Sequence, residues 1–186
     1  MARQRGPWSI TVGNMVDDLQ DPRRTEPDFL LAEREMLESW LEFHRMTLLL
    51  KCEGLDEERL KLRPVPTSKL SLHGIVRHMA EVERNWFRRV LKREPEAPHL
   101  WRTETNDEAD LAPLDSTDWQ HDRSVWEREC AASRETASTR TLDETGLRHG
   151  RPCSLRWIYL HMIVEYARHN GHADLIRELL DEAVGW

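Results

Sequence analysis

The sequence predicts an all-α protein, a four-helix bundle with a long connection between its second and third helices. Apolar residues recur at intervals of three and four in four long segments, which is typical of amphipathic helices. No segment shows the alternating β-branched pattern of a strand. Between the second and third segments, residues 94–114 contain three prolines, and a stretch of this length spans a bundle from one end to the other.

The four predicted helices are bounded by proline, glycine and polar residues that stop or cap helices. The glycine-containing residues 141–152 are expected to form a loop before the last helix. The predicted helices cover, in order, about residues 29–54, 71–93, 116–140 and 154–183, with a short helical turn at 56–62.

Length, charge and cysteine content limit the class of protein. The 186 residues suit one domain, which we divide into an irregular leader, 1–29, and a bundle, 30–186. A net charge of -7 without a concentrated basic run argues against nucleic-acid binding. No apolar run approaches the length of a membrane span, which is about 20 residues. The first 30 residues also lack the apolar core of a secretory signal. Three cysteines without a CxxC motif favour a reducing compartment, so we expect a cytoplasmic protein with a small-molecule partner.

The last predicted helix carries polar residues in the middle of its apolar stripe. Burying a polar group without a partner costs a few kcal/mol, so these residues must pair with one another, face a water-filled pocket or bind a metal. Glu165 and His169 lie one turn apart on one face of a helix, and this favours the metal site over a Glu165–His169 hydrogen-bond network. The stripe runs through Leu155, Ile158, Met162, Glu165, His169, His172, Ile176 and Leu179.

The second predicted helix supplies a third candidate ligand. His78 lies three residues after Ile75 and four before Val82, at the border of that helix's apolar stripe. One histidine from one helix and a Glu/His pair from another leave coordination positions open, which is the pattern of catalytic sites. Nitrogen and oxygen ligands suit Zn²⁺, Ni²⁺, Fe²⁺ or Mn²⁺ without choosing among them.

Other histidines and the tryptophans receive separate interpretations. His44 lies on the stripe of the first helix, where it either packs in the core or acts as an acid, base or substrate contact. His172, one turn after His169, is the second catalytic candidate as a pocket residue, or else a fourth ligand. His73 and His161 are expected to be peripheral. The tryptophans assigned to the core or to a pocket wall are Trp40, Trp86, Trp126 and Trp157.

Two segments resemble the signature helices of the DinB superfamily. Residues 72–87, LHGIVRHMAEVERNWF, resemble its second-helix signature, and residues 161–172, HMIVEYARHNGH, resemble its last-helix signature. The resemblance covers about residues 30–184 and is strongest to an actinobacterial branch of unknown function. It implies a DinB-like four-helix bundle, a metalloenzyme and a homodimer.

The resemblance also implies a metal-ligand set. The superfamily's usual ligands are one histidine from the second helix and a His-x-x-x-His pair from the last, followed by Arg-Gly-Gln. These positions fall on His78, Glu165 and His169, with Asn-Gly-His at 170–172 in place of Arg-Gly-Gln. Glu165 departs from the three-histidine form, although mycothiol-dependent maleylpyruvate isomerases are similar in using His, Glu and His.

For function, the resemblance implies a divalent-metal-dependent thiol S-transferase with mycothiol or bacillithiol as the thiol co-substrate. In that chemistry the sulfur binds the metal as a thiolate, which lowers its pKa. Relatives of this kind also include isomerases and hydrolase-like proteins. The alternatives are a non-catalytic metal- or small-ligand-binding protein of the stress response, and a structural bundle with a hydrogen-bonded polar seam. An open coordination position favours the enzyme, whereas a closed sphere that includes His172 favours binding alone.

Overall fold

The computed structural model describes residues 21–111 and 116–183, and this part of the chain is mostly helical. The first 20 residues of the expected leader lie outside the described residues, and residues 21–29 form only turns and irregular backbone. The elements are, in order, α1 (Glu33–Cys52), α2 (Glu57–Lys61), α3 (Leu72–Glu83), the π-helix η1 (Arg84–Leu91), α4 (Trp119–Ser138), β1 (Thr145–Arg148), β2 (Arg151–Ser154) and α5 (Leu155–Asp181).

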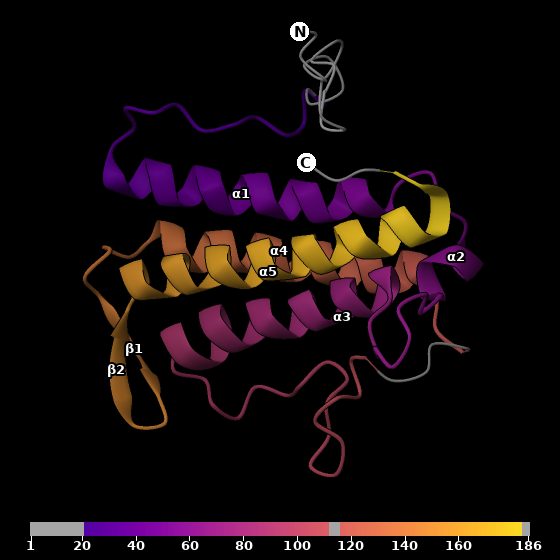
Figure 1. Ribbon diagram of the computed structural model, residues 1–186. Coiled ribbons are helices and arrows are strands. Elements are labelled where there is room, and N and C mark those ends of the chain that lie inside the picture. Colours follow the sequence, from indigo (N-terminus) through magenta and orange to yellow (C-terminus); the bar gives the residue numbers. More distant parts are fainter. Residues whose placement is uncertain (1–20, 112–115, 184–186) are drawn as a thin grey trace, which may run out of the picture.

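The long helices lie side by side around an apolar core (Figure 1). Helix α1 packs along α5, while α3 packs against α4 and α5. The stripes that predicted the helices supply the core, except that Leu179 is 59% exposed near the end of α5. None of the helices in the described ranges combines the length and the apolar character that crossing a membrane requires. The large side chains that are fully buried are Leu41, Leu48, Leu60, Leu72, Ile75, Met79, Leu91, Leu155, Ile158, Met162, Tyr166 and Ile176.

Side-chain caps set the starts of three long helices close to where the sequence predicts them. In each case the capping oxygen accepts a hydrogen bond from the backbone N–H three residues later, which satisfies one of the free donors of the first turn. Helix α4 starts at Trp119, slightly later than expected, because the cap comes from the residue before it. The capping residues are Ser71, Asp118 and Ser154.

The segment expected as a loop contains a β-hairpin, so the prediction of a chain without strands is wrong. Strand β1 pairs antiparallel with β2, and the turn between them consists of His149 and Gly150, both at positive φ. A Cβ atom at Gly146 would lie 2.3 Å from the carbonyl oxygen of Val90, so only glycine lets the hairpin approach η1 this closely. Four-residue strands are too short for an alternating pattern to be visible in the sequence.

The second long helix is not a uniform α-helix. It is α-helical to Glu83 and then continues as the π-helix η1, whereas the sequence predicted one helix over 71–93. Periodicity alone does not reveal such a change, because the apolar stripe continues through both parts. π-helical turns occur frequently at functional sites.

A buried ion pair joins the long helices at the start of η1. The Arg45 guanidinium donates from Nε to Glu83 Oε1 at 2.8 Å and from Nη2 to Oε2 at 2.6 Å. The hydroxyl of Tyr166 donates to Glu83 Oε1 at 2.8 Å and accepts from Trp126 Nε1 at 2.9 Å. The Cys130 thiol of α4 also donates to Glu83 Oε1, with Sγ at 3.7 Å. The Glu83 carboxylate therefore has direct contacts from α1, α4 and α5.

Removing either member of this pair should destabilise the protein. Arg45→Met leaves the Glu83 carboxylate buried without a counter-ion, and we expect it to lower the free energy of unfolding by about 3–5 kcal/mol. Glu83→Gln should cost less, because Arg45 keeps its ion pair with Glu42. Urea unfolding followed by circular dichroism measures this loss.

The matched control breaks an exposed pair. Arg123→Met removes the partner of Glu127 on α4, and this should cost less than about 1 kcal/mol. The double variant Arg45→Met/Glu83→Leu should recover part of the loss, because no buried charge remains unpaired. Single variants as stable as Arg123→Met would show that the buried pair does not govern the packing.

Candidate metal centre

Three side chains from two helices converge inside the protein. His78 on α3 and Glu165 and His169 on α5 each offer one ligand atom, and these atoms all lie within 4.8 Å of one another. His169 is buried and the other two are half-buried. The structure therefore brings together the three residues that the sequence singles out as metal ligands, and we call them the His78–Glu165–His169 cluster.

The donor set of the cluster suits a divalent metal. Two imidazole nitrogens and one carboxylate oxygen fit Zn²⁺ and its neighbours in the first transition row. Ligand atoms about 2.0–2.2 Å from one ion lie at most about 4.4 Å apart, so small side-chain rotations would close the set around an ion. Glu165 Oε2 lies 3.8 Å from His169 Nε2, which is too long for the hydrogen bond of the polar-network alternative.

His169 is held in the uncharged form that can bind a metal. Burial, reinforced by the neighbouring imidazoles of His78 and His172, lowers the pKa of His169 to about 3. At neutral pH its imidazole therefore keeps a free lone pair. The ring centroids of His78 and His169 are 4.7 Å apart, so two protonated rings would repel each other at this distance.

A buried carboxylate orients His78. Asp110 Oδ2 lies 2.8 Å from His78 Nδ1 and also accepts from Nε and Nη2 of Arg102 at 3.1 and 2.9 Å. Burial raises the pKa of Asp110, but the hydrogen bonds from His78 and Arg102 outweigh it and hold the pKa below its usual value. With Nδ1–H donating to Asp110, the lone pair of His78 Nε2 is free, as in carboxylate–histidine–metal arrangements.

The long connection between η1 and α4 supplies both Asp110 and Arg102. It runs along α3 (Figure 1) and is held there by Glu81, whose Oε1 accepts from the backbone N–H groups of Trp101 and Arg102 at 2.7 and 3.1 Å. Sequence reasoning missed Asp110, because it is one of several acids in a stretch without periodicity. The connection therefore positions a predicted ligand in addition to spanning the helices.

Of the two histidines expected to be peripheral to the site, His161 lies beside the cluster, while His73 is buried elsewhere between α3 and α4. The Nε2 atom of His161 lies 3.5 Å from Glu165 Oε1, and its ring stacks on Trp157 with centroids 5.0 Å apart. The i, i+4 spacing to Glu165 was the signal that could have placed His161 beside the cluster. His73 is fully buried, and its Nε2 lies 2.9 Å from Asp122 Oδ2, so it joins α3 to α4.

The two histidines predicted as catalytic have different neighbours. His172 Nδ1 is 3.5 Å from His169 Nδ1, so this half-buried ring is a direct neighbour of a predicted ligand. His44 instead faces Asn170, whose amide donates to the His44 carbonyl oxygen at 3.0 Å, and burial lowers the pKa of the His44 ring. His44 thus meets α5 one residue beyond His169, and its catalytic role stays a prediction.

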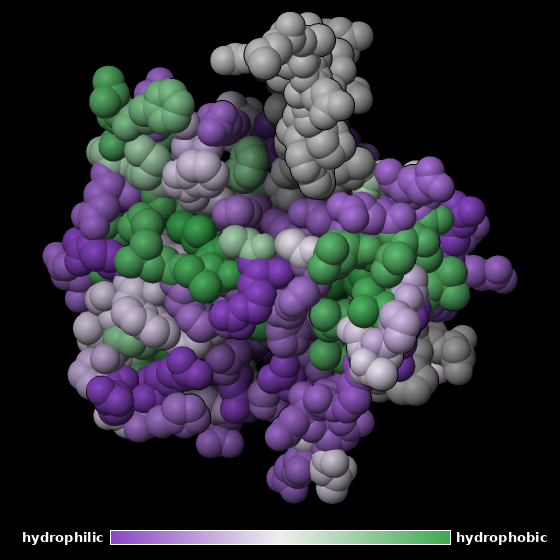
Figure 2. All heavy atoms as spheres, viewed as in Figure 1, coloured by the Kyte–Doolittle hydropathy of each residue, from purple (hydrophilic) through white to green (hydrophobic). Residues whose placement is uncertain are grey.

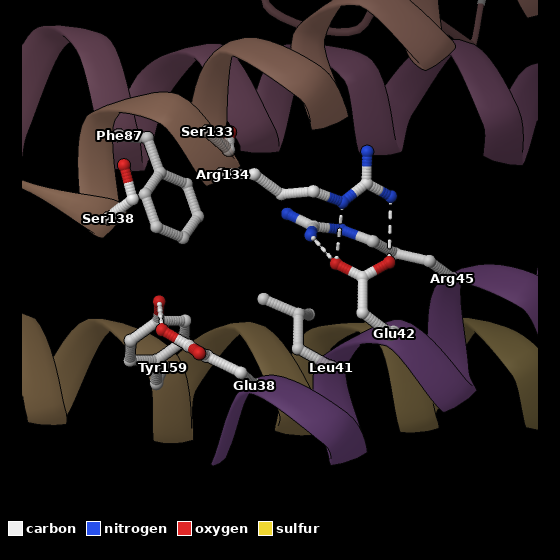
Figure 3. A pocket seen from close by; sticks show the side chains of 9 residues that line it. All are labelled: Glu38, Leu41, Glu42, Arg45, Phe87, Ser133, Arg134, Ser138 and Tyr159. Atoms are coloured by element: carbon white, nitrogen blue, oxygen red, sulfur yellow. Dashed lines mark hydrogen bonds and ion pairs between the residues drawn. The ribbon is translucent and has the colours of Figure 1, made fainter. Parts of the chain in front are cut away.

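A separate cavity of about 440 Å³ lies among α1, η1, α4 and α5 (Figure 3). Its charged side chains bind one another: Glu42 accepts from Arg134 at 2.8 and 2.7 Å and from Arg45 at 2.6 Å. Glu38 accepts from the hydroxyl of Tyr159 at 2.9 Å. Because these charges are already paired, the cavity is a weaker candidate for a reactive site than the cluster.

Comparison with known families gives one match over most of the chain. A family model described as mycothiol-S-transferase matches residues 36–182, a range that contains the cluster and Asp110. A comparison with curated proteins finds no match.

The contact between Asp110 and His78 generates a prediction about metal affinity. Asp110→Asn keeps the size of the side chain but removes the charge that holds His78, so we expect the affinity for Zn²⁺ to fall by about 10–100-fold. Titration with Zn²⁺ against a competing chelator measures this. Glu108→Gln changes an exposed acid of the same connection and should leave the affinity unchanged. Equal affinities of the two variants would count against the orienting role of Asp110.

Proposed function

Because the chain belongs to the mycothiol-S-transferase family, we propose that it is a divalent-metal-dependent enzyme that transfers the sulfur of mycothiol to a small electrophile. Membership bears out the resemblance to the DinB superfamily, and the family's name favours mycothiol over bacillithiol. We propose, for the same reason, that the long helices form the superfamily's four-helix bundle. The observation that carries the proposal is the convergence of His78, Glu165 and His169 in the interior.

The residues around the cluster have separable roles in this proposal. A divalent ion held by His78, Glu165 and His169 would favour the thiolate form of a sulfur ligand. Asp110 keeps the Nε2 atom of His78 directed to that position, and the low pKa of His169 keeps its ring neutral.

His172 is the base that we propose for the thiol, because it is half-buried and lies directly beside His169. The thiol proton passes to this imidazole and the sulfur forms a bond to carbon of the electrophile. The leaving group departs with the electrons of the broken bond.

Two features support an enzyme over a protein that only binds metal. Three protein ligands leave coordination positions open, and His172 lies outside the group of three. A binding protein without turnover remains the alternative. Elemental analysis will identify which of Zn²⁺, Ni²⁺, Fe²⁺ and Mn²⁺ is bound, and the transfer assay will identify the electrophile.

The expected homodimer remains part of the proposal. Exposed apolar side chains follow α5, and Figure 2 shows hydrophobic surface over parts of this helix. A second copy covering them would bury apolar area. These side chains are Leu160, Val164, Leu175 and Leu179. The cytoplasmic location and the small-molecule partner, which the cysteine pattern and the charge balance favour, also remain proposals.

The function is tested by elemental analysis of protein purified without an affinity tag, followed by a thiol-transfer assay. We expect about one divalent ion per chain, and mycothiol transfer to 1-chloro-2,4-dinitrobenzene or a bromomethyl arene that stops with a chelator and returns with metal. His78→Ala should lose metal and activity together, whereas His121→Ala, an exposed histidine on α4, should keep both. Bound metal without transfer to any electrophile would favour the binding protein.

Metal removal should also lower thermal stability. A ligand that binds only the folded state at 100 times its Kd stabilises that state by about 2.7 kcal/mol, so chelation should lower the Tm of the metal-loaded protein. The Tm of His169→Ala should no longer respond to the chelator, while the Tm of His121→Ala should respond like that of the original chain. A similar response in both variants would contradict the assignment of His169 as a ligand.

The two catalytic candidates should keep the metal. We expect His172→Ala to retain metal and to lower kcat by about 10²–10⁴-fold, as loss of a general base does. His44→Ala should also retain metal, and its rate decides whether this ring serves the substrate or only packs against Asn170. Loss of metal from His172→Ala would make this residue a ligand instead.

A further inference from the structure

A basic pocket lies between the hairpin and the start of α5. It has a volume of about 620 Å³, and no acidic residue lines it, although the chain as a whole has a net charge of -7. We call it the hairpin pocket. Its lining residues are Arg148, His149, Arg151, Pro152, Cys153, Ser154 and Trp157.

The two arginines of the hairpin pocket have no acidic partner within the described ranges. The cavity of Figure 3 is the opposite case, since Glu42 there is held by two arginines. Arg148 is fixed by a different contact, because its guanidinium lies over the ring of Trp86 at 4.5 Å from the centroid. A positioned guanidinium without a counter-ion suits a carboxylate, which it binds through two parallel hydrogen bonds.

The helix terminus beside the pocket does not supply the donors for such an anion. The N–H groups of Leu155 and Arg156 donate to backbone carbonyls of the preceding loop at 2.9 Å. The N–H of Trp157 donates to Ser154 Oγ at 3.2 Å. Because these donors are used, recognition of an anion depends on the arginines, and this makes it testable by substitution.

A row of contacts connects the hairpin pocket to the cluster. Trp157, which is 43% exposed, stacks on His161 at an interplanar angle of 8°, and His161 in turn lies 3.5 Å from Glu165. The π-helix places Trp86 against both rings, with centroids 5.2 Å from Trp157 and 4.3 Å from His161. Glu165 follows Trp157 by eight residues, so these two residues lie about 12 Å apart along α5.

We propose that the hairpin pocket binds the carboxylate of a ligand with an aromatic or apolar body. Arg148 and Arg151 hold the carboxylate, and Trp157 supports the body of the ligand as it extends toward the cluster. The assignment of this ligand to a transfer reaction rests on the proposed function, whereas its binding does not. The carboxylate belongs to the electrophile, because mycothiol carries no carboxylate, and the second experiment tests this assignment.

The first experiment measures binding to the full chain after metal removal. The probe is naphthalene-2-carboxylate, and its neutral counterpart is naphthalene-2-carboxamide, both titrated by calorimetry. We expect the carboxylate to bind about 10-fold more tightly than the amide, as charge-assisted hydrogen bonds do. Arg151→Gln and Arg148→Gln should each remove most of that preference, and Trp157→Leu should weaken both probes.

The matched control is Arg59→Gln, an exposed arginine on α2 at the opposite end of the molecule from the hairpin (Figure 1). It should bind both probes like the original chain. Arg148→Gln could disturb packing, because Arg148 lies over Trp86. Within the part of the chain that the structure describes, Arg151 has no such contact, so Arg151→Gln tests the carboxylate preference separately from folding. Equal affinity for the acid and the amide, or an unchanged preference in Arg151→Gln, overturns the proposal. Since the protein is metal-free here, this failure is separate from a failure of metal-dependent transfer.

The second experiment uses the metal-loaded protein and asks which substrate the probe displaces. Competition of naphthalene-2-carboxylate with 4-(bromomethyl)benzoate would assign the pocket to the electrophile, and the KM of its methyl ester should then be higher. Competition with mycothiol alone would overturn the assignment, because this thiol carries no carboxylate for the arginines to bind. Inhibition that competes with neither substrate would overturn the link between the pocket and the reaction.

Discussion

The carboxylate of Glu83 is buried where the long helices meet, and such a group is tolerated only if its partners are in place. Arg45 and Tyr166 bind it directly, and Trp126 binds the tyrosine. An unpaired buried charge costs several kcal/mol, so α1, α4 and α5 are constrained to one rotation and height relative to α3. Tyr166 follows Glu165 in α5, and Glu83 lies five residues after His78 in α3. The same constraint therefore sets where the cluster residues meet.

After Glu83 the second long helix continues as the π-helix η1, and the position of the hairpin depends on contacts with η1. The π-helix presents Trp86 to His161 and to the guanidinium of Arg148. Gly146 allows β1 to lie against the backbone of η1, since a side chain there would collide with Val90. The hairpin is thus fixed against rigid elements on one side, and its two strands hold Arg148 and Arg151 across a two-residue turn.

The parts predicted from the sequence are those encoded by local spacing. Glu165 and His169 are four residues apart and therefore share one face of a helix, and His78 borders the apolar stripe of another. Packing these two helices together is enough to bring the three side chains close. Asp110 is different: it contacts His78 across 32 residues from a stretch without periodicity. Nothing in the sequence distinguishes Glu83 from a surface acid, because its partner Arg45 is 38 residues away. Contacts of this kind depend on tertiary packing, which single-sequence patterns do not contain.

Helix α5 carries two of the three predicted ligands, Glu165 and His169, and also Trp157, which forms the aromatic wall of the hairpin pocket. Trp157, His161, Glu165 and His169 recur every four residues along α5, so the separation between pocket and cluster is set by helical rise rather than by a loop. In the proposed transfer, a rigid spacing of this sort favours ligands of matching length, because the reactive carbon would reach the sulfur only when the anchored end fits. The arginines proposed to bind the carboxylate are in the hairpin, where Arg151 is exposed. Changes in the hairpin can therefore alter which ligand is bound while the cluster stays intact.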